Sequence, residues 1–184
     1  MRTALIFLVI VGLVLGGSWL TARIQSVAPE APKDGWKLHT ALDFSIEYPP
    51  EYIVESEVNK VSFTVGTSTR EGTNLSSDTK LSVESVEVEG KCNAEMFIDT
   101  PASSTLVTDQ GVAYSFVTVS DAGAGNRYEE RVFVPVDSSP CRVVRYFIHS
   151  TAVENYDPGT IKAFDHTALI ATFDRMRRSL TELY

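Results

Sequence analysis

Apolar and polar residues alternate along several short runs of the chain. These runs lie at residues 44–48, 61–65, 81–88, 112–119, 128–136 and 141–148. A period of two is typical of strands that bury one face. The fourth and fifth runs flank Asp121–Asn126, a segment of Gly, Ala and polar residues that favours a tight turn, so the pattern predicts a long hairpin.

A different period occurs near the carboxyl terminus. Apolar residues recur at steps of three to five positions between Ile161 and Leu180, which predicts an amphipathic helix. We expect Arg175, Arg177 and Arg178 to lie on the exposed side and end of this helix. The predicted fold class is therefore α+β: an N-terminal transmembrane helix, followed by an antiparallel β-sheet domain packed with the C-terminal helix.

The amino-terminal segment is the most apolar part of the chain. Residues 3–22 carry no charged side chain, and Arg2 and Arg23 stand at the two ends of this run. A helix of that length reaches about 30 Å, the thickness of the hydrocarbon core of a bilayer. The run is longer than the roughly 7–15 apolar residues of a cleavable signal. We therefore predict an uncleaved signal anchor over residues 1–23; a cleaved signal and a buried core helix are the alternatives.

The rest of the chain divides into a linker and one domain. Residues 24–35 contain two Pro and show no hydrophobic period, as expected of a tether, and residues 36–184 form the predicted domain. Arg2 and the amino terminus favour a cytoplasmic amino end, because Lys and Arg gather on the inner side of a membrane. The protein would then be a single-pass membrane protein whose domain lies outside the cytoplasm, in the periplasm or at the cell surface.

The charge of the chain restricts its partners. The net charge is −8, from 16 Lys and Arg against 24 Asp and Glu, whereas a nucleic-acid-binding protein needs a basic face. The same charge disfavours contact between the domain and anionic lipid. We expect membrane contact through the N-terminal helix, no nucleic acid, and an envelope protein or ligand of unknown identity as partner.

The two cysteines, Cys92 and Cys141, are 49 positions apart and belong to no CxxC motif. For a domain outside the cytoplasm we predict a structural disulfide between them. Closing such a loop would contribute about 4 kcal/mol on the chain-entropy model. The alternative is a cysteine nucleophile with His149 as its base, but no feature of the sequence favours a thiolate.

Other candidate chemistry is sparse. The three histidines, His39, His149 and His166, show no metal-binding spacing, so we predict neither a metal site nor a cofactor. Acidic residues lie on two predicted strands and could act as paired carboxylates on a sugar substrate, although alternation places many of them on the solvent side. These acidic residues are Glu84, Glu87, Glu89, Glu129 and Glu130. We therefore expect no catalytic residue.

Several sequence strings resemble known families. Trp36–Pro50 (WKLHTALDFSIEYPP) is similar to the opening hairpin of the PsbP-like α/β sandwich. Other strings resemble an uncharacterised family of small bacterial membrane-anchored envelope proteins. These strings are GTNLSSDTKLSV (Gly72–Val83), Cys92, DAGAGNRYEE (Asp121–Glu130), Cys141, YFIHST (Tyr146–Thr151), Asn155-Tyr156 and AFD (Ala163–Asp165). The resemblance implies an envelope location and supplies no catalytic residue.

The function predicted is that of a membrane-tethered, extracytoplasmic, non-catalytic binding or accessory module. An envelope hydrolase using paired carboxylates and a regulatory or inhibitor module for another envelope protein are the alternatives. Candidate binding residues lie in three segments, Asp121–Arg127, Gly72–Asp78 and His149–Tyr156, whose hydroxyl, amide and aromatic groups could contact a ligand. They are Asn74, Asn126, Arg127, Ser150, Asn155 and Tyr156.

Overall fold

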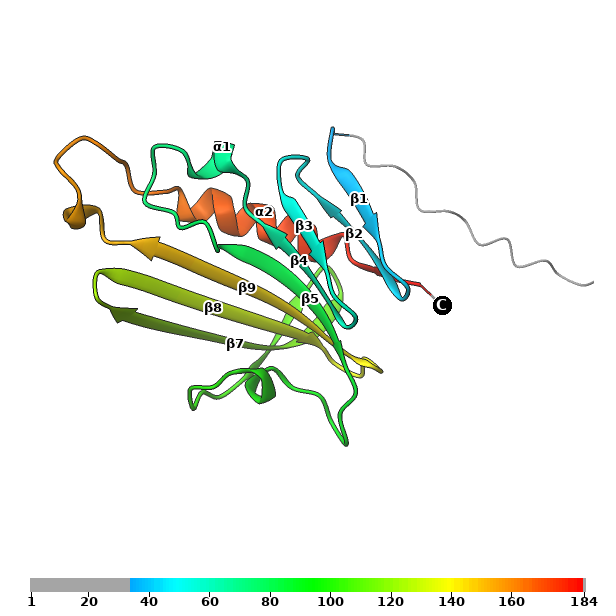
Figure 1. Ribbon diagram of the computed structural model, residues 1–184. Coiled ribbons are helices and arrows are strands. Elements are labelled where there is room, and N and C mark those ends of the chain that lie inside the picture. Colours follow the sequence, from blue (N-terminus) through cyan, green and yellow to red (C-terminus); the bar gives the residue numbers. More distant parts are fainter. Residues whose placement is uncertain (1–33, 184) are drawn as a thin grey trace, which may run out of the picture.

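The computed structural model describes residues 34–183, which form two antiparallel sheets and a carboxy-terminal helix (Figure 1). The large sheet has the strand order β3-β4-β5-β9-β8-β7-β6, and the small sheet has the order β1-β2-β10. In chain order the elements are β1 (Lys37–Thr40), β2 (Phe44–Tyr48), β3 (Ile53–Ser56), β4 (Lys60–Thr64), α1 (Thr67–Arg70), β5 (Lys80–Val86), η1 (Ala94–Phe97), β6 (Thr105–Asp109), β7 (Val112–Gly123), β8 (Asn126–Pro135), β9 (Cys141–Thr151), η2 (Val153–Asn155), α2 (His166–Arg178) and β10 (Thr181–Glu182).

The α+β class with a single sheet is wrong. Strands account for 45% and helices for 16% of the described residues, so the domain is mostly β and has two sheets. The run at residues 44–48 is a strand, β2, but it pairs with β1 and with β10 rather than with the large sheet. Alternation shows that a strand buries one face; it does not show which strands pair.

The predicted anchor, residues 1–23, lies outside the described residues, as does most of the linker. Within residues 34–183, no helix has both the length and the apolar character needed to cross a membrane.

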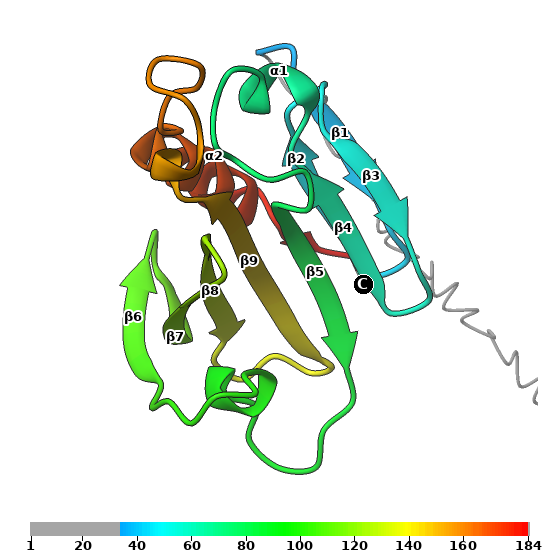
Figure 2. The ribbon, with the colours of Figure 1, turned by 60° about the vertical axis from the view of Figure 1, so that its left-hand side comes forward.

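The core lies between the large sheet and α2, which crosses one face of that sheet (Figures 1 and 2). β9 pairs with β5 on one side and with β8 on the other. Its alternate side chains Val144, Tyr146 and Ile148 are buried on the α2 side. From α2, Phe173 packs on Tyr146 with ring centroids 5.2 Å apart. The predicted hairpin at residues 112–136 is confirmed as β7 and β8.

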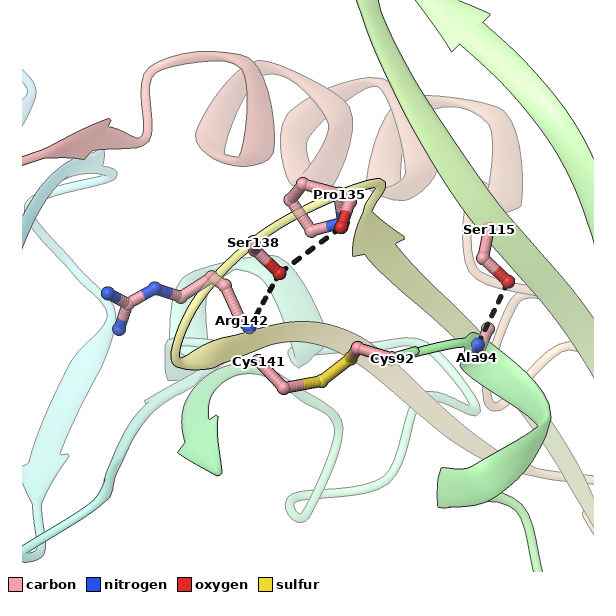
Figure 3. The surroundings of a disulfide bond; sticks show 7 residues. All are labelled: Cys92, Ala94, Ser115, Pro135, Ser138, Cys141 and Arg142. Carbon is pink, nitrogen blue, oxygen red and sulfur yellow. Dashed lines mark hydrogen bonds between the residues drawn. A yellow bond between two sulfur atoms is a disulfide. The ribbon is translucent and has the colours of Figure 1, made fainter. Parts of the chain in front are cut away.

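A second apolar cluster covers the opposite face of the large sheet. It is closed by the segment that contains η1, and the disulfide between Cys92 and Cys141 ties that segment to the start of β9 (Figure 3). The two Cα atoms are 5.8 Å apart, and the predicted disulfide is confirmed. The backbone N–H of Ala94 donates to Ser115 Oγ on β7 at 2.9 Å. The segment is therefore attached to β9 by the disulfide and to β7 by this hydrogen bond.

The prediction that Arg177 is exposed is wrong, because its side chain is only 3% exposed. Position 177 follows Phe173 by four residues and therefore shares the inner face of α2. Its Nε donates to the Tyr146 hydroxyl at 2.9 Å, and its guanidinium pairs with Asp109 and Asp174. Burial alone would lower the pKa of Arg177, but interactions with Tyr146 and Asp109 raise it above its ordinary value.

A second buried arginine, Arg142, joins the two sheets. It lies on β9 of the large sheet, and its Nη2 is 2.8 Å from Asp43 Oδ2 and 2.8 Å from Glu182 Oε2, which belong to the small sheet and its β1–β2 turn. Its guanidinium also covers the ring of Phe44 at 5.0 Å from the centroid. Burial alone would lower the pKa of Arg142, but Glu182 and Asp43 raise it.

Candidate functional site

A cleft of about 840 Å³ opens at the end of the large sheet where the β7–β8 hairpin turns and β9 ends. We name it the hairpin-end cleft. Its walls come from four separate segments of the chain, so the fold assembles it from residues far apart in sequence. The lining residues are Asn74, residues 120–122, residues 127–129, Ile148, residues 150–154, Ala163, Phe164 and His166.

The hairpin tip is fastened to the turn that follows β9. Ala124 and Gly125 both have positive φ, 50° and 79°, as a two-residue type I′ turn requires. The carbonyl oxygen of Gly125 accepts from the backbone N–H of Ala152 at 2.8 Å and from Asn155 Nδ2 at 3.1 Å. A Cβ at Gly125 would lie 2.4 Å from Asn155 Nδ2, so this contact requires glycine.

Asn74 connects three segments behind the cleft. Its side-chain Nδ2 donates to Thr151 O at 2.6 Å, and its Oδ1 accepts from the Phe164 N–H at 2.8 Å. Its backbone N–H donates to Lys162 O at 3.0 Å. Both ends of the side-chain amide are therefore hydrogen-bonded to other segments, and Asn74 holds the wall of the cleft in place.

His149 lies on the opposite face of the sheet from the cleft-lining Ser150. Its Nδ1 is 2.8 Å from Asp78 Oδ1, and its Nε2 is 3.0 Å from Asn126 Oδ1. Its ring stacks on Tyr128 with centroids 4.4 Å apart. These contacts tie the loop before β5 to the hairpin tip. Both cysteines are joined in the disulfide, and Cys141 begins β9 whereas His149 lies near its other end.

A polar cluster of Glu129, Arg131 and His166 lies beside the cleft. His166 Nε2 is 2.8 Å from Glu129 Oε2, and Arg131 Nε is 2.5 Å from Glu129 Oε1. Burial alone would raise the pKa of Glu129, but the hydrogen bonds from Arg131 and His166 lower it below its ordinary value. Glu129 is therefore held as a carboxylate that bridges β8 and the start of α2.

The other acidic residues singled out in the sequence do not join Glu129 in the cleft. Glu84 and Glu130 pair with Arg145, and Glu84 also pairs with Lys60 at 3.2 Å. Burial alone would raise the pKa of Glu84, but the charges of Arg145 and Lys60 outweigh burial and bring this pKa below its ordinary value. Glu87 and Glu89 are exposed beyond the end of β5. Within residues 34–183, no group of three or more His, Cys, Asp and Glu side chains is placed to hold a metal ion.

All six candidate binding residues lie at this end of the sheet. Asn74, Arg127 and Ser150 line the cleft. Asn126 and Asn155 fasten the hairpin tip, and the Tyr156 hydroxyl is 2.9 Å from Thr151 Oγ1. Arg127 is exposed and makes no ion pair with any residue in the described part of the chain, which leaves its guanidinium available to a ligand.

Sequence reasoning did not select Glu129 and His166 as binding residues, nor Phe164. Glu129 and His166 are 37 positions apart, and their contact depends on how β8 lies against α2. The one signal in the sequence was the position of His166, a polar residue near the start of the predicted helix.

A second cleft of about 640 Å³ lies on the far side of the segment 162–165. Trp36, Pro50 and Tyr52 give it an aromatic and proline-rich wall, and the Arg175 guanidinium covers the Trp36 ring at 3.8 Å from the centroid. None of the six candidate binding residues lines this second cleft, which shares only Ala163 and Phe164 with the hairpin-end cleft.

No family model matches this sequence, and no curated protein matches it. The fold is similar to that of the Ran-binding protein Mog1p of Saccharomyces cerevisiae, with a TM-score of 0.51 and 12% identity over 79% of this chain and 94% of that chain. A crystal structure from Bacteroides thetaiotaomicron VPI-5482 is similar with a TM-score of 0.44 and 11% identity over 77% of this chain; this chain covers 45% of that one. At such identities the likeness to Mog1p shows the fold alone, and the resemblance to PsbP-like and envelope families stays a prediction.

Proposed function

We propose that the chain is a non-catalytic binding or accessory module of the cell envelope, tethered by its amino-terminal segment, and that it binds its partner at the hairpin-end cleft. One observation carries this proposal: four segments are fastened together around an open cleft of about 840 Å³. Ligand sites commonly measure about 300–1,000 Å³ and present a few fixed polar groups between apolar walls. Arg127 and Ser150 supply polar groups at this cleft, and Phe164 contributes to its apolar wall.

The state of the carboxylates favours binding over hydrolysis. A glycosidase needs one carboxylic acid with a raised pKa near a second carboxylate. Glu129 has a lowered pKa, and both of its oxygens are occupied by Arg131 and His166. Both sulfur atoms are in the disulfide, so neither cysteine supplies a thiolate.

The envelope location is supported by two features. The uncharged run over residues 3–22 has the length of a membrane span. The Cys92–Cys141 disulfide is the kind of cross-link that persists in oxidising compartments. On this basis the domain lies outside the cytoplasm.

Site-specific photo-crosslinking in cells tests the proposed site. A benzophenone amino acid would replace Arg127 or Glu154 at the cleft in the full-length protein, and Leu42 or Val58, which are 101% and 97% exposed, as controls. The controls lie in the β1–β2 and β3–β4 turns, away from the β7–β8 hairpin tip (Figure 1). We expect one discrete adduct from both cleft positions and none from the controls. Equal adducts at all four positions, or none at the cleft, would contradict the proposal.

A further inference from the structure

The geometry of the β7–β8 hairpin determines which backbone groups of β7 face outward. In an antiparallel ladder the residues that flank a two-residue turn form a hydrogen-bonded pair, and such pairs alternate with non-bonded ones. Gly123 and Asn126 flank the turn and are paired. The N–H and C=O groups of Ala122, Ser120 and Thr118 therefore point away from β8, toward the outer edge of the sheet.

The outer neighbour of β7 is too short to reach these groups. β6 pairs with residues 112–116 only, through a second two-residue turn at Gln110 and Gly111. The Ala122 N–H donates to Asp121 Oδ1 at 2.8 Å. For Thr118 and Ser120, no backbone hydrogen bond to any element beyond β7 occurs among the described residues. Both residues are exposed, and this part of β7 forms the margin of the sheet beside the hairpin tip (Figure 1).

We propose that this open edge, Val117–Gly123, binds an extended peptide segment of the partner protein as an added β-strand. The inference rests on the proposed function and names the chemistry of its ligand. Within the described part of the chain, the outward N–H and C=O groups of this edge have no main-chain partners. An added strand is the ligand that supplies such partners in register.

The added strand would also reach the hairpin-end cleft. Ser120 and Ala122 belong both to the open edge and to the lining of the cleft. Alternate side chains of the peptide would point toward the unpaired Arg127 on that face of the sheet. On the opposite face they would lie near Val119, which packs on the second apolar cluster. The main chain thus supplies affinity, and the cleft supplies specificity for one side of the peptide.

Proline at position 120 tests this inference. Because the Ser120 N–H points outward, Ser120→Pro removes an edge donor and leaves the β7–β8 ladder bonds in place. Ser120→Ala is the matched control, since it removes only the hydroxyl. Thr118→Pro is a second variant of the same kind. The probe is a phage-displayed library of short linear peptides, selected on the detergent-solubilised full-length protein, and the enriched peptides are then synthesised for affinity measurements.

We expect Ser120→Ala to bind the selected peptides within about twofold of the wild type, and Ser120→Pro to bind at least about tenfold more weakly, the equivalent of one or two lost main-chain hydrogen bonds. Peptide should also slow amide exchange at Thr118 and Ser120 in the wild type. This exchange measurement decides the matter even where both proline variants unfold: protection at these amides supports the inference, and protection elsewhere overturns it.

The remaining outcomes separate this inference from the proposed function. Equal binding by Ser120→Pro and Ser120→Ala would overturn strand addition. A selection that yields no peptide, while the benzophenone at position 127 still gives its adduct, would also overturn strand addition. In both cases the cleft would remain the binding site for another ligand. A dimer that Ser120→Pro abolishes, without peptide binding, would assign the edge to a second copy of this chain and overturn the partner peptide. Absence of both peptide and crosslink would overturn both proposals.

Discussion

The two ends of β9 differ. At its start, Cys141 and Arg142 are buried and joined to neighbouring elements by a disulfide and by ion pairs, whereas Ser150 and Thr151 at its end border an open cleft. The buried end is held by a disulfide and by ion pairs between the two sheets. The open end is held by hydrogen bonds of Asn74 and Gly125 that position loops without filling the space between them. The comparison indicates that packing and cross-links close one end of the sheet, whereas the other end leaves an open cleft, where we propose that a partner binds.

Loss of the disulfide should have the largest effect on the buried end. Replacing both Cys92 and Cys141 by Ala should lower the free energy of unfolding by about 4 kcal/mol on the chain-entropy model. Urea unfolding of the variant, and of the wild type with and without reductant, measures this. A benzophenone at position 127 should still form its adduct at temperatures where the variant without the disulfide is folded. An unchanged unfolding midpoint would show that the disulfide does not stabilise this end.

Arg142→Ala should follow, with a loss of about 2 kcal/mol, because it removes a buried side chain that packs on Phe44 and joins the two sheets. The two carboxylates left behind, Asp43 and Glu182, are 39% and 37% exposed and regain contact with water. The control is Lys91→Ala, an exposed cation near the same disulfide, which should change stability by less than about 0.5 kcal/mol. Chemical denaturation of both variants makes the comparison. Similar losses of unfolding free energy in the two variants would mean that the contacts of Arg142 with the small sheet do not stabilise the domain.

At the open end, Asn74→Ala should cost about 2 kcal/mol, since it leaves Thr151 O and the Phe164 N–H without their partner. Asn59→Ala, at an exposed position of the β3–β4 turn, is the control and should be nearly neutral. Amide exchange should quicken at Phe164 in the first variant and not in the second. Unchanged exchange at Phe164 would show that Asn74 does not hold the wall of the cleft.

The smallest effect concerns pH. Because the folded-state pKa of Glu129 lies below its ordinary value of 4.5, its carboxylate contributes stability that is present above that value and is lost as pH falls through the lower folded-state pKa. Glu129→Gln should therefore flatten the decline of stability below about pH 4.5, whereas Glu154→Gln, at an exposed position, should not. Thermal melting across pH compares the two. Parallel profiles for Glu129→Gln and the wild type would contradict the assignment.

Local features of this fold could be predicted from the sequence. The hairpin follows from alternation on both sides of Asp121–Asn126, and the disulfide follows from two isolated cysteines. The six candidate binding residues gather at one end because the turn after β7 and the end of β9 are neighbours in a hairpin-linked sheet.

Features that depend on distant pairing could not be predicted. Alternation marks β2 as a strand without assigning it to the small sheet, and helical spacing does not reveal that Arg177 will find Asp109 across the core. The Glu129–His166 contact likewise needs the position of α2 over β8. In each case the arrangement depends on a partner that lies far away in the sequence.

Whether the proposed membrane-tethered module binds its partner at the hairpin-end cleft can be decided by amide exchange of the full-length protein, compared between native membranes and the purified detergent-solubilised state. A partner bound at the hairpin-end cleft should protect residues 117–128 and 149–156 in membranes and leave the turns at Leu42 and Val58 unchanged. Protection at those turns alone, or identical exchange of the hairpin end in both states, would contradict the assignment of the open end as the binding site.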